Sequence, residues 1–186
     1  MNTRLRKRNK GLSQVVTTLI ILVVGVLLAS VVSYYATNVT MTRTSHEEVR
    51  ITKAYVWVNY TGAVAAFKVQ NLGGRDILID QFLIRSIEAD PSTVYYYRVP
   101  SETIFNDDMN ITSYDILIGD LVEIDGLNYT RTTTDIPLMS GGEILVYIRV
   151  SSNVQMDDIG TTISVGITTN NAQYLTETNV RSATSQ

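Results

Sequence analysis

Three consecutive residues near the N-terminus, Lys10, Gly11 and Leu12, form a junction at which a peptidase could act. The first ten positions hold five basic residues and no acidic one, and no charged residue follows the glycine until Arg43. An ordinary secretory signal is cut after its apolar core, beside small residues. Here the junction precedes the apolar core, so cleavage between Gly11 and Leu12 would leave the whole apolar segment on the mature chain. We therefore predict that this segment has a structural role after export.

The rest of the sequence offers little catalytic chemistry. Its single histidine, His46, lies in a polar stretch without a catalytic partner nearby in the sequence, and cysteine is absent. These features disfavour nucleophilic catalysis and thiolate metal sites. The acidic pairs Asp107-Asp108 and Asp157-Asp158 do not have the spacing of an EF-hand, so we interpret them as solvated turns. We expect a protein that is not an enzyme and that needs no cofactor or metal.

Four N-x-[ST] triplets mark possible N-glycosylation sites, at Asn38, Asn59, Asn110 and Asn128. In an exported chain, this number of triplets favours a glycosylated surface. We expect Asn110 and Asn128 to lie in polar loops, where they would be the better acceptors. Asn38 is expected at the end of a helix, where neighbouring subunits could cover it, and Asn59 in a strand that could bury it.

The elements that must position these residues begin with an apolar helix. Residues 12–42 carry no charge, and as a helix they would extend about 45 Å, more than the roughly 30 Å hydrocarbon core of a bilayer. The basic residues before them predict a cytoplasmic N-terminus, with the following domain outside. Gly25, Ala29 and Ser33 recur every four residues, a pattern that allows close approach of another helix. A plain single-pass anchor and a cleaved secretory signal are the alternatives.

The basic leader and the helix resemble a known signal. The sequence from Arg6 to Gln14, followed by a Val/Ile/Leu-rich helix, is similar to the class III signal of archaeal type IV pilins and archaellins. In that family a prepilin peptidase cuts after the glycine, and the helices then bundle into a filament core. Bacterial pilins carry glutamate at the fifth mature position, where this chain has Val16. The resemblance covers about residues 6–42.

After residue 50 the apolar residues alternate with a period of two, which predicts β-strands. Ala65, Phe67 and Val69 are one such set, and the runs that end at Val150 and Thr168 are others. Glycine and asparagine turns separate six to nine expected strands, a pattern typical of an immunoglobulin-like β-sandwich. The more polar residues 101–129 are predicted to form a loop-rich insertion or outer-face strands. The predicted fold class is α+β: leader 1–11, helix 12–42, linker 43–49 and β-domain 50–186.

Charge and resemblance together lead to a functional hypothesis. Five of the 15 lysines and arginines lie in the leader, so the chain after Gly11 has ten basic and 18 acidic side chains, a net charge of −8. No basic face remains to indicate a nucleic-acid partner. The resemblance implies a membrane-inserted precursor, a prepilin peptidase and assembly machinery as partners, and an extracellular helical homo-oligomer. We favour an adhesion pilin over an archaellin, with a membrane-anchored extracellular binding module as the alternative from another class.

Overall fold

The computed structural model describes residues 3–101, 103, 105–150 and 152–183; the side chains of residues 3–11 and 43–45 lie outside the described residues. The chain divides into two compact units, residues 1–44 and 45–186. The elements follow in this order: α1 (Thr3–Ser45), β1 (Val49–Val58), β2 (Ala63–Asn71), β3 (Ile77–Ile84), β4 (Ile87–Glu88), η1 (Pro91–Thr93), β5 (Val94–Val99), β6 (Leu121–Ile124), β7 (Leu127–Arg131), β8 (Ile136–Leu138), β9 (Glu143–Val150), η2 (Met156–Asp158), β10 (Thr162–Thr169) and β11 (Gln173–Ser182).

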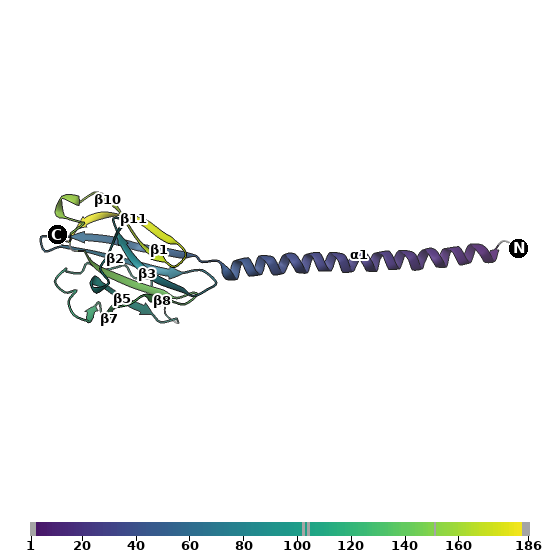
Figure 1. Ribbon diagram of the computed structural model, residues 1–186, viewed down its shortest axis with the longest axis horizontal. Coiled ribbons are helices and arrows are strands. Elements are labelled where there is room, and N and C mark those ends of the chain that lie inside the picture. The colour runs from purple at the N-terminus through teal and green to yellow at the C-terminus, as the bar shows by residue number, and fades with distance from the viewer. Residues whose placement is uncertain (1–2, 102, 104, 151, 184–186) are drawn as a thin grey trace. The chain divides into compact units, whose positions relative to one another are not determined.

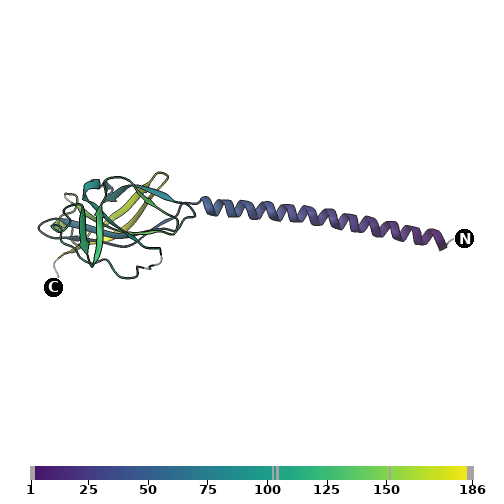
Figure 2. The same ribbon diagram turned by 90° about the horizontal axis from the view of Figure 1, so that it is seen from below.

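The predicted fold class, a long apolar helix followed by an all-β domain, is confirmed. Figures 1 and 2 show α1 as one uninterrupted helix from two directions. The helix has 43 residues, about 65 Å at 1.5 Å per residue. It continues past residue 42 to Ser45, and β1 begins at Val49, so residues 46–48 connect them where the sequence predicted a linker over 43–49. The described part of the β-domain has eleven strands, against the six to nine expected.

The strands form one hydrogen-bonded path that curls into two layers. Its order is β4-β3-β10-β11-β1-β2-β9-β5-β7-β6, and β8 pairs with β3. The last strand joins the layers: residues 173–179 of β11 pair antiparallel with β10, and residues 180–182 pair in parallel with β1. The first and last strands of the domain therefore lie side by side, as Figure 1 shows.

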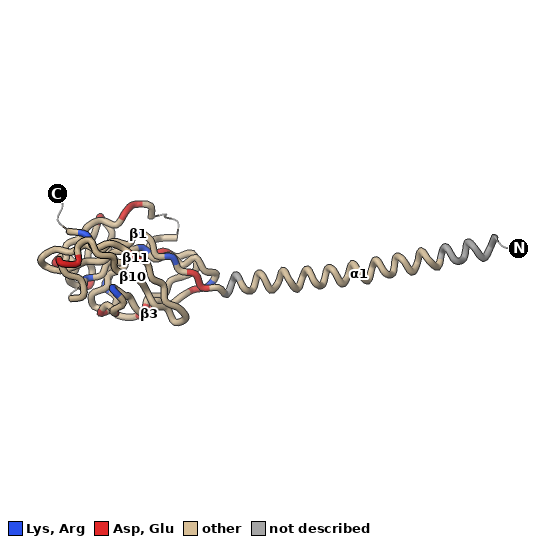
Figure 3. Tube along the Cα trace, turned by 90° about the horizontal axis from the view of Figure 1, so that it is seen from above, with Lys and Arg blue, Asp and Glu red and all other residues tan. Residues whose placement is uncertain are grey.

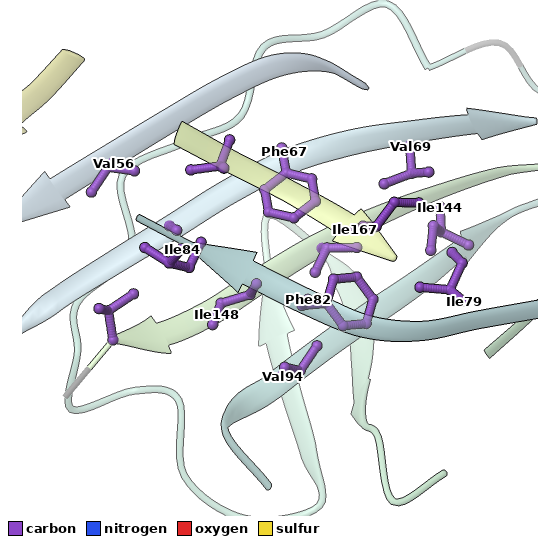
Figure 4. Packing of buried hydrophobic residues seen from close by; sticks show 14 of the residues in the cluster. Val56, Phe67, Val69, Ile79, Phe82, Ile84, Val94, Ile144, Ile148 and Ile167 are labelled. Carbon is purple, nitrogen blue, oxygen red and sulfur yellow. The ribbon is translucent and has the colours of Figure 1, made fainter. Parts of the chain in front are cut away.

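A first hydrophobic core fills the space between the two layers. Phe67 of β2 faces Phe82 of β3, with ring centroids 6.3 Å apart. Ile148 of β9 and Ile167 of β10 pack in the same cluster, and both are fully buried. Figure 4 shows these side chains converging from strands far apart in the sequence. The alternation seen in the sequence produced this core, because every second residue of a strand points to the same face.

A second core lies on the opposite face of the layer that contains β2 and β9. Leu145 and Tyr147 of β9 and Ala66 of β2 are buried there, on the face that the alternating pattern would leave to solvent. The covering side chains include Met109 and Leu117 from the irregular segment before β6. Both faces of β2 and β9 are thus buried, since residues 105–129 cover their outer side.

Candidate functional site

The first functional candidate is the apolar helix itself. Within α1, the segment Leu12–Thr42 contains an 18-residue stretch with a mean hydropathy of 2.9, is long enough to cross a membrane, and has no residue of that stretch buried inside the chain. Figure 3 shows no charged residue along this part of the tube, whereas acidic residues lie on the β-domain. An isolated apolar surface of this size is unfavourable in water. The helix therefore requires an apolar environment that its own chain does not supply.

The predicted processing junction lies inside this helix. Lys10, Gly11 and Leu12 all belong to α1. The side chain of Leu12 is 60% exposed, whereas the side chain of Lys10 and the surroundings of Gly11 lie outside the described residues. Cleavage after Gly11 stays a prediction.

The small residues of the helix provide a surface that another helix could approach. Gly25, Ala29 and Ser33 are exposed and lie along one side of α1. A Cβ atom at Gly25 would meet nothing within 4 Å outside its own helix. Glycine at this position is therefore not required by packing within the chain, and its role in helix packing stays a prediction.

Several hydroxyl groups on the apolar helix bond to carbonyls of the helix itself. Thr17 donates to the carbonyl of Ser13 at 2.9 Å, and Ser30 donates to the carbonyl of Val26 at 2.8 Å. Thr37 makes the same kind of bond to the carbonyl of Ser33, at 2.9 Å. Because an unpaired hydroxyl in hydrocarbon is costly, these bonds make the segment compatible with a lipid environment.

The residues that follow the helix are fixed to the β-domain through the turn between β2 and β3. The carbonyl of Glu48 accepts from the amides of Leu72 (2.8 Å) and Gly73 (3.0 Å), and the carbonyl of His46 accepts from Gly74 (3.2 Å). A Cβ on Gly73 would lie 2.7 Å from the His46 carbonyl oxygen and 2.8 Å from the Glu48 nitrogen. Only glycine leaves room for this backbone contact.

The side chain of Glu47 fixes the same segment to the other layer. Its carboxylate accepts a 2.8 Å hydrogen bond from Asn171 and one from the Thr169 hydroxyl, and it lies 3.5 Å from the Arg75 guanidinium. The Glu47 side chain is only 8% exposed. Tyr174 donates to the Glu47 carbonyl at 3.4 Å, and burial followed by the Glu47 charge raises the pKa of Tyr174. We call residues 46–48 with these partners the anchor segment.

A buried ion pair under the second core was not predicted from the sequence. Lys68 of β2, 5% exposed, lies 2.7 Å from a carboxylate oxygen of Glu143 in β9 and donates to the Phe105 carbonyl at 3.0 Å. Gln70 donates to the other oxygen of Glu143. In the alternating sequence pattern of β2, Lys68 falls on the face expected to meet solvent, and no local signal in the sequence marks it as buried. The pair joins β2 and β9 and holds the segment that covers them.

Two side chains of β1 also hold this covering segment. Lys53 has a φ of 52° where the pairing of β1 with β2 shifts register. Its ammonium donates to the carbonyls of Asn106 (2.5 Å) and Asp107. Tyr55 donates to Asp108 at 2.8 Å, and this bond to a carboxylate is the main reason that its pKa is raised. The bulge in β1 thus directs Lys53 toward two carbonyls of this segment.

The four predicted glycosylation sites have different surroundings. Asn38 is exposed on α1. Asn59 is half-buried and follows β1, in the turn to β2, so the expectation that it lies in a strand is wrong. Asn110 is exposed in an irregular segment and donates to Asp125 at 2.9 Å. Asn128 is exposed but lies in β7, a strand rather than the expected polar loop.

The remaining candidates for chemistry are dispersed. His46 is exposed, and its carbonyl belongs to the anchor segment. Asp158 accepts from the Gln155 amide at 2.9 Å and pairs with Arg85 at 3.1 Å, which holds its pKa below the usual range. Among the described residues there is no group of three or more His, Asp or Glu side chains placed to hold a metal ion.

Comparison with known proteins does not assign the chain to a family. No family model matches the sequence, and no curated protein matches it. What the fold and the sites define is a class of architecture: an N-terminal apolar helix long enough to cross a membrane, followed by a sandwich-like all-β domain.

Proposed function

We propose that this chain is the structural subunit of a surface filament of the archaeal type IV pilin class. The observation that carries the proposal is the 31-residue apolar segment Leu12–Thr42, of which nothing is buried inside the chain. At about 25 cal/mol per Å² of apolar surface, transfer of such a helix into water would be unfavourable by tens of kcal/mol. A helix bundle made of its own copies keeps it out of water outside the membrane.

Before assembly, the same helix suits a lipid bilayer. Its 31 residues extend about 47 Å, beyond the roughly 30 Å hydrocarbon core. The hydroxyl groups of Thr17, Ser30 and Thr37 are bonded to helix carbonyls, so they add little cost in lipid. The basic residues before Gly11 favour retention of that end in the cytoplasm. The precursor would thus stay in the membrane with its β-domain outside.

In the filament, small residues would set the distance between neighbouring helices. Without a hydrophobic driving force in lipid, helices associate by close packing, and Gly, Ala and Ser permit the closest approach. Gly25, Ala29 and Ser33 supply such residues on one side of α1. Head-to-tail contacts between identical subunits that do not close into a ring generate an open helical polymer.

The segment that joins α1 to the β-domain is bonded in a way that suits a subunit under tension. The chain leaves α1 at Ser45 and is at once bonded to both layers through the anchor segment. It then enters β1, which pairs with β2 from Val49 to Val58 and with β11 from Val56 to Val58. A pull on the chain at residue 46 would reach these ladders first, where several hydrogen bonds share the load. This arrangement supports a role in a filament under tension.

Adhesion is the role that we favour within this class, and an archaellin of a swimming filament is the alternative there. A single-pass membrane anchor with an extracellular binding domain is the alternative from another class. All three share an architecture in which a helix compatible with membrane insertion or with a signal sequence is joined to an all-β domain. A filament subunit would give a role to the junction before the apolar core, which the single-pass anchor leaves unexplained.

The mass of the mature protein separates the filament from the anchor. We expect surface material that sediments as filaments, contains a chain starting at Leu12, and is visible by electron microscopy. A Gly11→Val variant should keep the leader and yield no filament, whereas the control Gly126→Ala, in the β6–β7 hairpin, should still be processed. Wild-type chains that all retain residues 1–11 in the membrane fraction would contradict the proposal.

A further inference from the structure

A groove of about 410 Å³ opens beside the end of β1, between the turn of residues 59–62 and residues 154–157. Valine side chains form part of its lining, and its polar walls carry the amides of Asn59 and Gln155 and the carboxylate of Asp157. Tyr60 and Met156 stand at the same groove. Its volume falls within the usual range of about 300–1,000 Å³ for small-molecule sites.

The turn that carries Tyr60 is held in one conformation. The side-chain oxygen of Asn59 accepts from the amides of Thr61 (2.9 Å) and Gly62 (3.0 Å) and from the Thr61 hydroxyl (2.6 Å). Gly62 sits against the ring of Tyr114, since a Cβ there would lie 2.5 Å from it. On this fixed turn the Tyr60 side chain is 90% exposed and contributes to neither hydrophobic core.

The opposite wall is fixed in a similar way. Gln155 and Asp158 form reciprocal bonds around the single turn η2, and Asp158 is paired with Arg85 at 3.1 Å. Arg85 also donates to the Asn153 carbonyl at 3.1 Å. These bonds leave the neighbouring Asp157 exposed at the groove. Both walls are therefore ordered before any ligand binds, which lowers the entropic cost of binding.

We propose that this groove binds a neutral pyranose sugar. An exposed tyrosine offers an apolar ring face for the C–H face of the sugar and keeps a polar hydroxyl at its edge. A carboxylate accepts strong hydrogen bonds from sugar hydroxyls. The amide nitrogens of Asn59 and Gln155 can donate others, since their oxygens already accept bonds within the two walls. Asp157 and the net charge of the domain, 18 acidic against nine basic side chains from residue 45 onward, disfavour anionic sugars.

The groove lies wholly within the β-domain, so this inference does not depend on the filament proposal. A single shallow site of this kind would bind weakly, with a Kd of about 1 mM. If the chain does assemble into filaments, each subunit would present one copy, and multivalent contact with a glycan-covered surface would raise the avidity without new contacts.

The test uses the full chain, made in a host without N-glycosylation and held in micelles of a polyoxyethylene detergent, which has no sugar head group. The probes are the methyl glycosides of glucose, galactose, mannose and N-acetylglucosamine, observed by saturation-transfer NMR and titration. We expect at least one to bind with a Kd below about 10 mM, and Tyr60→Ala and Asp157→Asn each to weaken it roughly tenfold or more. The control Leu175→Ala, at a residue 51% exposed and outside the groove, should bind like the wild type.

Three results would overturn the assignment. The first is no binding of any of the four glycosides at about 10 mM. The second is binding that Tyr60→Ala and Asp157→Asn leave unchanged, which would place the sugar elsewhere. The third is saturable binding of tetramethylammonium with no sugar binding, which would make the ring and carboxylate a cation site. The 90% exposure of Tyr60 means that its replacement should leave folding intact, and circular dichroism checks this.

Discussion

Replacing Lys68 by methionine removes the cation of the buried ion pair while keeping a side chain of similar length. Lys68 is 5% exposed, lies 2.7 Å from Glu143 and also donates to the Phe105 carbonyl. Its loss leaves the Glu143 carboxylate, 19% exposed, without its charged partner. Removal of one member of a buried pair destabilises a protein by about 3–5 kcal/mol. We expect a loss of this size in the free energy of unfolding.

The double variant Lys68→Met/Glu143→Leu tests the reasoning. Replacing both charges by apolar side chains of similar size is often neutral or stabilising, so the double variant should recover most of the loss. Both hydrophobic cores lie within residues 45–186, so this segment can be used for urea unfolding. The single tryptophan, Trp57, is 4% exposed in the second core and reports the transition by fluorescence.

Two outcomes would refute this account of the pair. One is a Lys68→Met variant within about 1 kcal/mol of the wild type, the size expected for an exposed pair. The other is a double variant whose loss equals the sum of the two single losses, which would mean that the two side chains do not interact.

Three further predictions concern the anchor, the buried tyrosines and the helix. Gly73→Ala should displace residues 46–48, which lowers the free energy of unfolding by about 2–4 kcal/mol through lost hydrogen bonds and speeds amide exchange at residues 72–74. The control Gly126→Ala, with an open Cβ position and a φ of 76°, should cost only about 1 kcal/mol. Equal losses in the two variants would contradict the steric argument. Burial raises the pKa of Tyr147 to about 12 from 10.0, so its contribution to stability is complete below pH 10 and is lost as the pH rises toward 12. The loss of unfolding free energy should reach about 1 kcal/mol at pH 11. Tyr147→Phe should make the decline of the urea midpoint at alkaline pH shallower. Gly25→Leu should leave membrane insertion of the precursor unchanged but prevent filaments seen by electron microscopy, and normal filaments would exclude a role for Gly25 in helix contact.

The helix and the first core were readable from the sequence because their signals are local. A charge-free run from Leu12 to Thr42 can be stable only as an apolar helix. The alternation of Ala65, Phe67 and Val69 likewise places one face of a strand in a core, and all three are fully buried. Such patterns need no knowledge of which segments meet in space.

The second core and the anchor could not be read in this way, because they depend on contacts between distant segments. Lys68 is buried because residues 105–109 fold over it. This segment is irregular, so its sequence has no periodic pattern from which its position over the sheet could be predicted. The parallel pairing of Val56 with Val180 joins the first and last strands, which no local pattern indicates. In the sequence, Gly73 looks like any glycine in a turn. Only the structure shows that a Cβ atom at this position would lie 2.7 Å from the His46 carbonyl oxygen.

In the proposed filament, α1 is packed against copies of itself outside the membrane. The chain has no cysteine, so an Ala29→Cys variant carries one thiol on the proposed contact side of the helix. In filaments sheared from cells, we predict that this thiol resists water-soluble maleimide and that a short membrane-permeant bis-maleimide links it to a second copy. A chain that is recovered only as detergent-solubilised monomers, keeps residues 1–11 and gives no linked product would contradict the account.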